Sequence, residues 1–307
     1  MANSTREIRR RVRSVKSIRQ ITRAMELVAA AKMQRAVAAV QQSRRYANLA
    51  WGMLRSITVG MDFRSHPLLA SRPRQRLLLI LLASNRGLAG GFNTRITDAA
   101  REYMNEQKNQ TPTLEIETVS LGKKGRDDLL KHGHKLVAEF ERSERAITSA
   151  DVAPLVKMIF QDYEAGKYDV AAVAYTDFVS MLKQEPRVKE ILPLTTRDSK
   201  LGSVYAETLD KEEALDKAEG YWQHLFEPDL ETVLAATIPR LLEVQLYQAL
   251  LESVASEHAA RMMAMRNASD AAVDLIDDLT LTYNQLRQSS ITSELAEISA
   301  GRLALGV

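Results

Sequence analysis

Two long stretches of the 307-residue chain contain neither glycine nor proline. The first runs from residue 1 to 51 and the second from residue 240 to 300. Because glycine and proline are the residues that most weaken a helix, their absence predicts two continuous helices. At ~1.5 Å per residue, these helices are about 75 and 90 Å long. A globule of this size has a radius of gyration of only about 19 Å, so the helices must protrude from it.

Apolar residues recur along both helices at steps of three and four, which indicates one contact face on each helix. In the first helix this face comprises Ile8, Val12, Val15, Ile18, Ile21, Met25 and Val28. In the second helix it comprises Leu242, Leu246, Leu250, Val254, Ile276, Leu279, Tyr283, Leu286, Ile291, Leu295 and Ile298. We therefore expect the helices to pair as a coiled coil, without a fixed register because the heptads are imperfect. We expect Gly52, followed by Gly60 and Pro67, to end the first helix.

The two helices carry opposite charge. Residues 1–51 hold twelve basic and two acidic residues, whereas residues 240–300 hold four basic and nine acidic residues. Such a split is typical of a nucleic-acid-binding protein, of a protein with a charged partner, or of two helices that pack together. Only Tyr46 and Trp51 are aromatic in the basic segment, which disfavours base stacking and hence nucleic acid.

The region between residues 75 and 210 alternates between strand-like and helix-like segments, which predicts an open α/β sheet. The expected strands cover residues 76–83, 113–121, 135–140 and 168–175. The expected helices cover residues 93–107, 126–131 and 154–165.

Composition excludes several classes of site. The chain has no cysteine, which excludes disulfides, thiolate metal sites and a cysteine nucleophile. Its longest apolar run, residues 77–83, is far shorter than the ~20 residues that span a bilayer. Arginines at residues 9–13 occupy the place of a signal-peptide core, so no secretory signal is expected. His132 and His134 indicate a solvated turn rather than a metal site, since no third ligand is near.

A glycine-rich loop at residues 84–91 follows a strand and precedes a helix, which is the position of a phosphate-binding loop. Its spacing matches neither the dinucleotide fingerprint nor the P-loop. A tight turn is the favoured interpretation and nucleotide binding the alternative. Residues 122–125, Gly-Lys-Lys-Gly, are a weaker echo of this pattern and are expected to form a turn.

Several longer motifs of the chain resemble those of one family. The segment IRRRVRSVKSIRQITRAMELVAAAKMQRA at residues 8–36 resembles the N-terminal signature of the gamma subunits of F-type ATP synthases. The segments SEHAARMMAMRNASDAA at residues 256–272 and YNQLRQSSITSELAEISAG at residues 283–301 resemble the family's C-terminal signature. SNRGLAGGFN at residues 84–93 and HLFEPD at residues 224–229 also match. The resemblance thus covers nearly the whole chain in the family's order.

The resemblance implies an α+α/β fold: a long antiparallel coiled coil of the N- and C-terminal helices plus a Rossmann-like open α/β middle domain. The implied ranges are residues 1–58 for the first helix, 75–210 for the middle domain and 211–307 for the second helix. It implies a central-stalk rotor that transmits torque between the proton-driven c-ring and the catalytic ring during ATP synthesis or hydrolysis. The chain itself is then not an enzyme and needs no cofactor.

The implied partners are the alpha and beta subunits of the catalytic ring, the epsilon subunit and the c-ring. They place the chain peripherally at the cytoplasmic face of a bacterial cell membrane. Plastid members carry a regulatory cysteine pair, so the absence of cysteine excludes thiol control and favours a bacterial origin.

The resemblance also assigns contact residues. Contacts to the beta subunits are implied for Met25, Glu26, Lys32, Arg287, Gln288, Thr292 and Glu294. Contacts to the c-ring and epsilon at the foot are implied for Phe226 and Glu227. Each has a plainer alternative: Met25 as coiled-coil core, Glu26 and Lys32 as solvated charges, and Arg287 paired with Glu294 inside the chain.

Two other classes of function remain as alternatives. One is a nucleotide-binding α/β enzyme with helical appendages, which would bind nucleotide by itself. The other is a coiled coil that binds nucleic acid, with an affinity that weakens steeply with salt.

Overall fold

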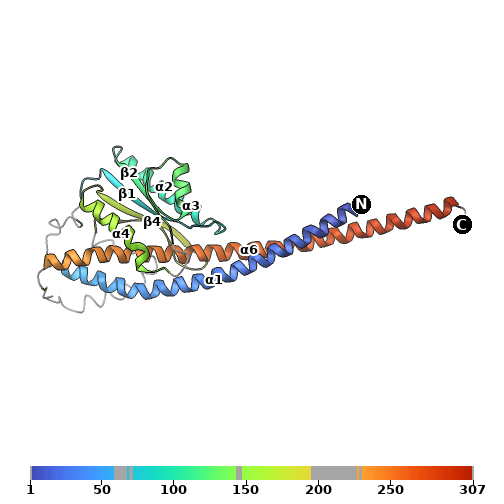
Figure 1. Ribbon diagram of the computed structural model, residues 1–307, viewed down its shortest axis with the longest axis horizontal. Coiled ribbons are helices and arrows are strands. Elements are labelled where there is room, and N and C mark those ends of the chain that lie inside the picture. Colours follow the sequence, from blue (N-terminus) through green and yellow to red (C-terminus); the bar gives the residue numbers. More distant parts are fainter. Residues whose placement is uncertain are drawn as a thin grey trace. The chain divides into compact units, whose positions relative to one another are not determined.

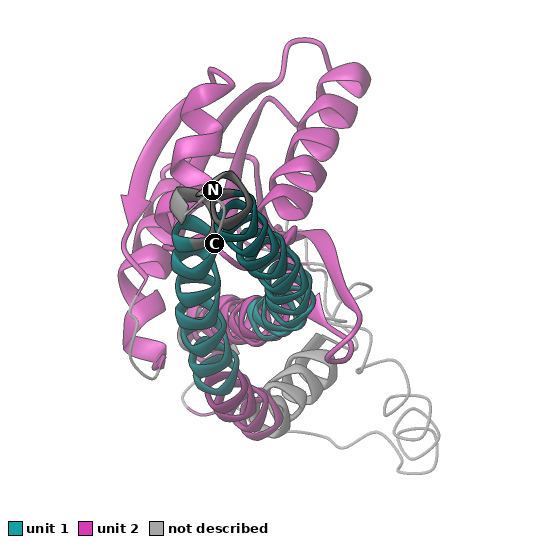
Figure 2. Ribbon diagram, turned by 90° about the vertical axis from the view of Figure 1, so that its right-hand side faces the viewer, with its two compact units in different colours: residues 1–29, 261–307 teal, residues 30–260 magenta. Residues whose placement is uncertain are grey.

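A computed structural model describes residues 2–58, 68, 72–142, 147–194, 227 and 230–305 (Figure 1). The chain divides into two compact units (Figure 2). Unit 1 comprises residues 1–29 and 261–307, and unit 2 comprises residues 30–260. Within the described ranges, every helix is too short or too polar to cross a membrane.

The two long helices predicted from the sequence are present. Helix α1 covers Ala2–Thr58 and helix α6 covers Leu230–Leu305. Helix α1 continues through Gly52, the first of the expected end signals, and its last residue is Thr58, as the range implied by the resemblance has it. Helix α6 begins ten residues before the expected start and contains Pro239. Helix propensity is a weak preference that packing overrides, and Ile238, Leu241 and Leu242 near Pro239 are buried in the core of unit 2.

In unit 1, burial along the helices follows a heptad repeat. On α6 the residues of lowest exposure recur at alternating steps of four and three, namely Met265, Ser269, Ala272, Ile276, Leu279, Tyr283, Leu286, Ser290 and Ser293. On α1 the corresponding residues are Ile8, Val12, Val15, Thr22, Met25, Glu26 and Ala29. Within this unit the helices run antiparallel: the N-terminus of α1 and the C-terminus of α6 lie at the same end of the pair, and α6 extends farther (Figure 1). The structure therefore gives the coiled coil a register that the sequence pattern left open.

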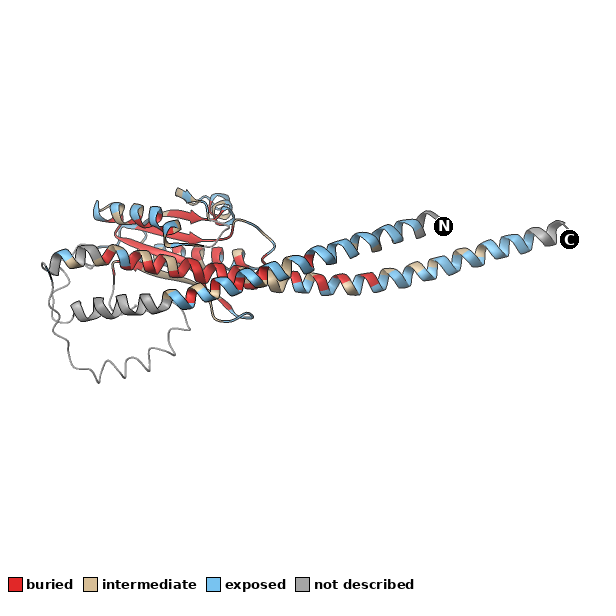
Figure 3. Ribbon diagram, turned by 60° about the horizontal axis from the view of Figure 1, so that its bottom comes forward, coloured by how far each residue is buried: buried red, intermediate tan, exposed pale blue. Residues whose placement is uncertain are grey.

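Several apolar residues of the expected contact faces are exposed instead. On α1 these are Ile18, Ile21 and Val28, and on α6 they are Ile291, Leu295 and Ile298. Small residues such as Ala29 and Ala272 occupy the buried positions, which brings the helix axes closer together. Figure 3 shows how much of both helices in unit 1 is left exposed.

The core of unit 2 is a five-stranded sheet with the order β3-β2-β1-β4-β5. Its strands are β1 (Arg76–Leu82), β2 (Glu115–Leu121), β3 (Leu136–Phe140), β4 (Val170–Phe178) and β5 (Gln184–Leu192). The pairs β1–β2, β1–β4 and β2–β3 are parallel, whereas β5 pairs with β4 in the antiparallel direction. The expected open α/β sheet is thus confirmed, with one antiparallel edge strand in addition.

Helices cover both faces of this sheet. The helices that alternate with the strands are α2 (Phe92–Gln110), α3 (Lys123–Lys131) and α4 (Ser149–Glu164). Leu78, Ile80 and Leu82 of β1 pack in one cluster with α4 and with residues 238–255 of α6. Leu77, Leu79 and Leu81 pack on the opposite face with α2 and α3. This alternation is the period of two that a buried strand requires.

Two expectations for the middle region are wrong. Residues 122–125 do not form a free turn, because α3 begins at Lys123 and contains Gly125. Strand β5 was not among the expected strands, and its residues include Pro186, which disfavours a strand inside a sheet. Proline is tolerated in a strand at the edge of a sheet, which is the position of β5.

Candidate functional site at the junction of α6 and the sheet

Within unit 2, residues 238–260 of α6 are buried almost all round (Figure 3). One side of this segment faces the sheet and carries Leu242, Leu246 and Leu250. Further along, two serines of the same segment bond to the strands. Ser253 Oγ donates to the carbonyl of Leu82 at 3.4 Å, and Ser256 Oγ donates to the carbonyl of Thr176 at 3.2 Å.

These two carbonyls lie toward the carboxyl ends of β1 and β4. Strand β2, which follows β1 in the sequence, lies on one side of β1, and strand β4 lies on the other side of β1. The strand order therefore reverses between β1 and β4. In open α/β sheets, the crevice at such a reversal is the usual place for a nucleotide or other ligand. Here α6 bonds to both strands at this edge. The chain therefore uses the customary ligand crevice to hold its own helix, which disfavours the nucleotide-binding alternative.

The glycine-rich loop after β1 is also bonded within the chain. The N–H of Ser84 donates to Asn93 Oδ1 at 3.1 Å, and its carbonyl accepts the N–H of Lys124 at 3.0 Å. Ala89 and Phe92 pack against Ala260 of α6. Because these groups are occupied by protein partners, the loop serves as the tight turn that the spacing favoured.

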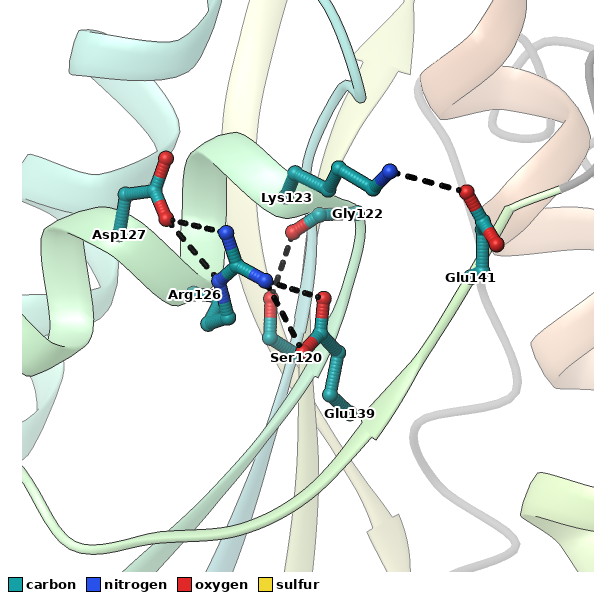
Figure 4. A network of polar contacts seen from close by, with 7 residues as sticks. All are labelled: Ser120, Gly122, Lys123, Arg126, Asp127, Glu139 and Glu141. Atoms are coloured by element: carbon teal, nitrogen blue, oxygen red, sulfur yellow. Dashed lines mark hydrogen bonds and ion pairs between the residues drawn. The ribbon is translucent and has the colours of Figure 1, made fainter.

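The second glycine motif lies beside this loop and joins three strands. The N–H of Gly122 donates to the carbonyl of Phe140 at the end of β3. A side chain at Gly125 would meet Ala83 Cβ at 2.9 Å, so only glycine lets α3 approach β1 this closely. Close to this motif, Arg126 bridges Asp127 and Glu139, and Lys123 pairs with Glu141 (Figure 4).

The other side of α6 in unit 2 faces residues 36–43 of α1, and a buried polar contact joins the two helices. Ser43 Oγ donates to Gln248 Oε1, and Gln248 Nε2 donates to Glu252 Oε1 at 2.9 Å. Gln248 and Glu252 are fully buried. Directional bonds of this kind fix the register of two packed helices, which apolar contacts alone leave loose.

A cavity of about 360 Å³ lies between α1, α4 and α6 next to this contact. Tyr247 lines it and donates through its hydroxyl to the carbonyl of Ile147 at 3.2 Å. Burial raises the pKa of Tyr247, and the nearby carboxylate of Asp151 adds to the effect. The phenol therefore stays protonated as a hydrogen-bond donor that ties α6 to the segment before α4.

The contact residues that the resemblance assigned on α6 lie on the surface of unit 1. Arg287, Gln288, Thr292 and Glu294 are exposed. Thr292 Oγ1 donates to the carbonyl of Gln288 at 2.9 Å, and Glu294 accepts from Ser290 at 3.4 Å. In the described part of the chain, no ion pair joins Arg287 to Glu294, so both ends of this segment present charge to the outside.

The assigned residues on α1 differ in exposure. Met25 and Glu26 are half-buried, and Glu26 pairs with Arg23 at 2.7 Å. Lys32 is exposed. Of the two residues that the resemblance assigned to the foot, Glu227 is exposed and Phe226 lies outside the described residues.

The sequence interpretation missed the residues that hold α6 to the sheet. Ser253 and Ser256 stand among apolar residues in the stretch SVASEHAA, where polar groups on an apolar helix are the only signal. A buried polar group needs a bonding partner, so such residues predict contact with another backbone or side chain. Which partner they meet depends on the fold, and the spacing of the serines does not reveal it.

Comparison with known proteins agrees with this arrangement of long helices around an anchored α/β domain. A family described as ATP synthase matches residues 4–305. The chain therefore belongs to the ATP synthase gamma family, as the resemblance of its terminal motifs indicated. The ATP synthase gamma chain of Herpetosiphon aurantiacus is 41% identical, over 98% of this chain and 99% of its own. That of Roseiflexus castenholzii is 40% identical, over 98% of each chain.

Solved structures share the fold. A chain of the Euglena gracilis mitochondrial ATP synthase rotor aligns with a TM-score of 0.62 and 18% identity, over 95% of this chain and all of its own. A chain from the central stalk and c-ring structure of the Tetrahymena thermophila mitochondrial ATP synthase aligns with a TM-score of 0.56 and 23% identity. This alignment covers 81% of the present chain and 99% of the Tetrahymena thermophila chain.

Proposed function

We propose that this chain is the central-stalk rotor subunit of an F-type ATP synthase and makes or breaks no covalent bonds itself. In this role it transmits torque between a proton-driven c-ring and a ring of alpha and beta subunits, during ATP synthesis or hydrolysis. The epsilon subunit is a further partner at the foot. The whole assembly would hold the chain peripherally at the cytoplasmic face of a bacterial cell membrane.

One observation carries this proposal: the helix that pairs in unit 1 is the same helix that is bonded to the sheet in unit 2. Helix α6 is unbroken over its 76 residues. Between residues 240 and 300 the helix contains neither glycine nor proline, the usual causes of a kink, so rotation applied at one end of this stretch reaches the other. One segment of α6 pairs with α1 in unit 1 and another segment is bonded to the sheet in unit 2. Such contacts at both segments suit a subunit that transmits torque along this helix.

The assigned residues would act as breakable contacts. An exposed arginine such as Arg287 makes charge-assisted hydrogen bonds with a carboxylate of a partner. In water such bonds form and break readily, which a rotor needs as it passes each beta subunit. The basic residues of α1 offer similar contacts to acidic loops of the ring. Met25, Glu26 and Lys32 are included in this proposal, as is Glu227 toward the c-ring.

Reconstitution tests the function itself. The purified chain, mixed with alpha and beta subunits of a bacterial ATP synthase, should give an ATPase that none of the components provides alone. The isolated chain should neither hydrolyse ATP nor bind it saturably. Saturable nucleotide binding by the chain, together with unchanged activity of the mixture, would support the enzyme alternative instead.

Replacing the exposed pair Arg287 and Gln288 with alanine tests the assigned contacts. Because both side chains are exposed in unit 1, we expect assembly to be retained and ATP turnover by the reconstituted complex to fall about tenfold, the equivalent of ~1.4 kcal/mol. The matched control is Asp277→Asn with Asp278→Asn, which removes two exposed charges of the same helix. Equal turnover in the two double variants would contradict the assignment.

A further inference from the structure

A buried ion pair joins α6 to the end of β3. Arg142 lies two residues beyond β3, and its guanidinium contacts the carboxylate of Glu257 on α6. Both side chains are nearly inaccessible, at 9% exposure for Arg142 and 3% for Glu257. The sequence interpretation singled out neither residue, and neither belongs to the assigned partner contacts.

The same arginine connects a third element. Its carbonyl accepts a hydrogen bond from Asn85 Nδ2 at 2.8 Å, and Asn85 belongs to the glycine-rich loop after β1. The loop after β1, the segment after β3 and helix α6 therefore meet at Arg142. Ser253 and Ser256, which bond to β1 and β4, lie on the preceding turn of α6.

Apolar packing and directional bonds contribute differently here. The leucines of α6 that cover the sheet resist separation, but apolar contact does not depend on direction. The bonds of Ser253 and Ser256 already oppose turning of the helix about its own axis, and a buried ion pair adds a second directional restraint one turn further along. The contact runs from one guanidinium nitrogen, Nη2, to Glu257 Oε2, so a turn of the helix that moves the carboxylate away leaves two buried charges separated, which is costly in a dry interior.

We propose that the Arg142–Glu257 pair is a positioning contact that fixes the rotation of α6 about its own axis on the sheet. This inference rests on the proposed function as a rotor. Torque that enters through the α/β domain then reaches α6 without slip. Arg142 and Glu257 act through the helix and touch no substrate.

The test uses the complete ATP synthase, rebuilt in vesicles with variants of this chain. It measures protons pumped per ATP hydrolysed, together with ATP hydrolysis itself. In Arg142→Met with Glu257→Met, apolar side chains of similar size replace the pair, so we expect the fold to be retained. We expect pumping per ATP to fall about threefold while hydrolysis stays near the unaltered rate. In the reversed pair, Arg142→Glu with Glu257→Arg, we expect more than half of the lost pumping to return.

The matched control is the exposed ion pair between Arg126 and Glu139, which lies near the end of the same strand (Figure 4). Changing both residues to methionine removes an ion pair that does not involve α6, so pumping per ATP should stay unchanged. A merely structural role for the buried pair predicts loss of thermal stability without loss of coupling. Unfolding temperatures are therefore measured for every variant.

Two results would overturn the inference. The first is normal pumping per ATP in the double methionine variant. If that variant fails to assemble, Arg142→Lys decides, because lysine keeps the charge but lacks the planar fork. We expect the complex with Arg142→Lys to pump fewer protons per ATP than the complex with the unaltered chain. Equal pumping by the two complexes is the second result that would overturn the inference. If the unaltered chain itself supports no ATPase, the proposed function fails instead.

Discussion

At the scale of single residues, the positions least open to change in unit 2 are those where strands and helices approach most closely. Gly122 has a φ of +109°, a region that side chains rarely adopt. A Cβ there would lie 2.3 Å from the carbonyl oxygen of Ala83. This oxygen belongs to backbone that is tied to β2 through the N–H of Ala83, so it cannot move away without breaking the sheet edge.

Gly122→Ala should therefore lower the free energy of unfolding by about 2–4 kcal/mol, since backbone strain and a backbone clash act together. Urea denaturation of the full-length chain measures the loss. The control is Gly166→Ala, where φ is +69° but no atom lies within 4 Å of the added Cβ. That change should cost only about 1–2 kcal/mol, the price of the left-handed conformation alone. Equal losses at both positions would rule out the clash.

At the scale of elements, strand β2 is linked to β3 and to the start of β4 by one carboxylate. Glu117 accepts hydrogen bonds from Lys135 Nζ and Tyr168 Oη, both at 2.5 Å. The bond from Lys135, followed by that from Tyr168, lowers the pKa of Glu117. Burial, followed by the bond to Glu117, raises the pKa of Tyr168 to about 12. The carboxylate is thus charged and the phenol protonated throughout the neutral range.

The lowered pKa of Glu117 has a direct consequence for stability against pH. A carboxylate with a lowered folded-state pKa binds fewer protons in the folded chain than in the unfolded chain. It therefore stabilises the fold fully at a pH above its ordinary, unfolded-state pKa near 4.5. This stabilisation is lost as the pH falls through the folded-state value.

Urea midpoints of the unaltered chain and Glu117→Gln should therefore differ by a constant amount above pH 5. The difference should shrink steadily below pH 4.5. The exposed residue Glu102 provides the control substitution, Glu102→Gln. A difference for Glu117→Gln that does not depend on pH would contradict the assigned hydrogen bonds.

At the scale of the whole molecule, the described surface of unit 1 carries apolar side chains that its own helices do not cover. Ile18, Ile21 and Val28 are exposed at 50%, 57% and 57%. Water-exposed apolar rows of this kind are typical of surfaces that meet a partner. In the proposed assembly, the ring of alpha and beta subunits would cover them.

Changing Ile18, Ile21 and Val28 to glutamine should make the isolated chain less prone to aggregate and should weaken its assembly with alpha and beta subunits. Each covered side chain contributes roughly 1.5–3 kcal/mol, so the loss of three should be large. Light scattering measures the first effect and pull-down titration the second. Val137→Gln, at an exposed position of β3, is the control and should change neither. Undiminished assembly of the triple variant would exclude these residues from the interface.

Much of this architecture follows from local sequence pattern. The absence of glycine and proline determines that both ends are long helices, because helix formation depends on residues three and four apart. The run at residues 77–83 determines a buried strand for the same local reason. The terminal motifs identify the family. By contrast, α1 continues through Gly52 and α6 includes Pro239, because packing supplies what local propensity lacks.

Only the tertiary structure decided which contacts form between distant segments. The sequence placed both Val12 and Ile18 in the contact face of the first helix, whereas the structure partly covers Val12 and leaves Ile18 exposed. Nor does spacing along the chain reveal that Arg142 meets Glu257, or that serines of α6 meet the ends of β1 and β4. Local sequence patterns determine the secondary structure of each segment. A buried polar pair joins two segments that are distant in the sequence, and these come within bonding distance only when the sheet and its helices pack together.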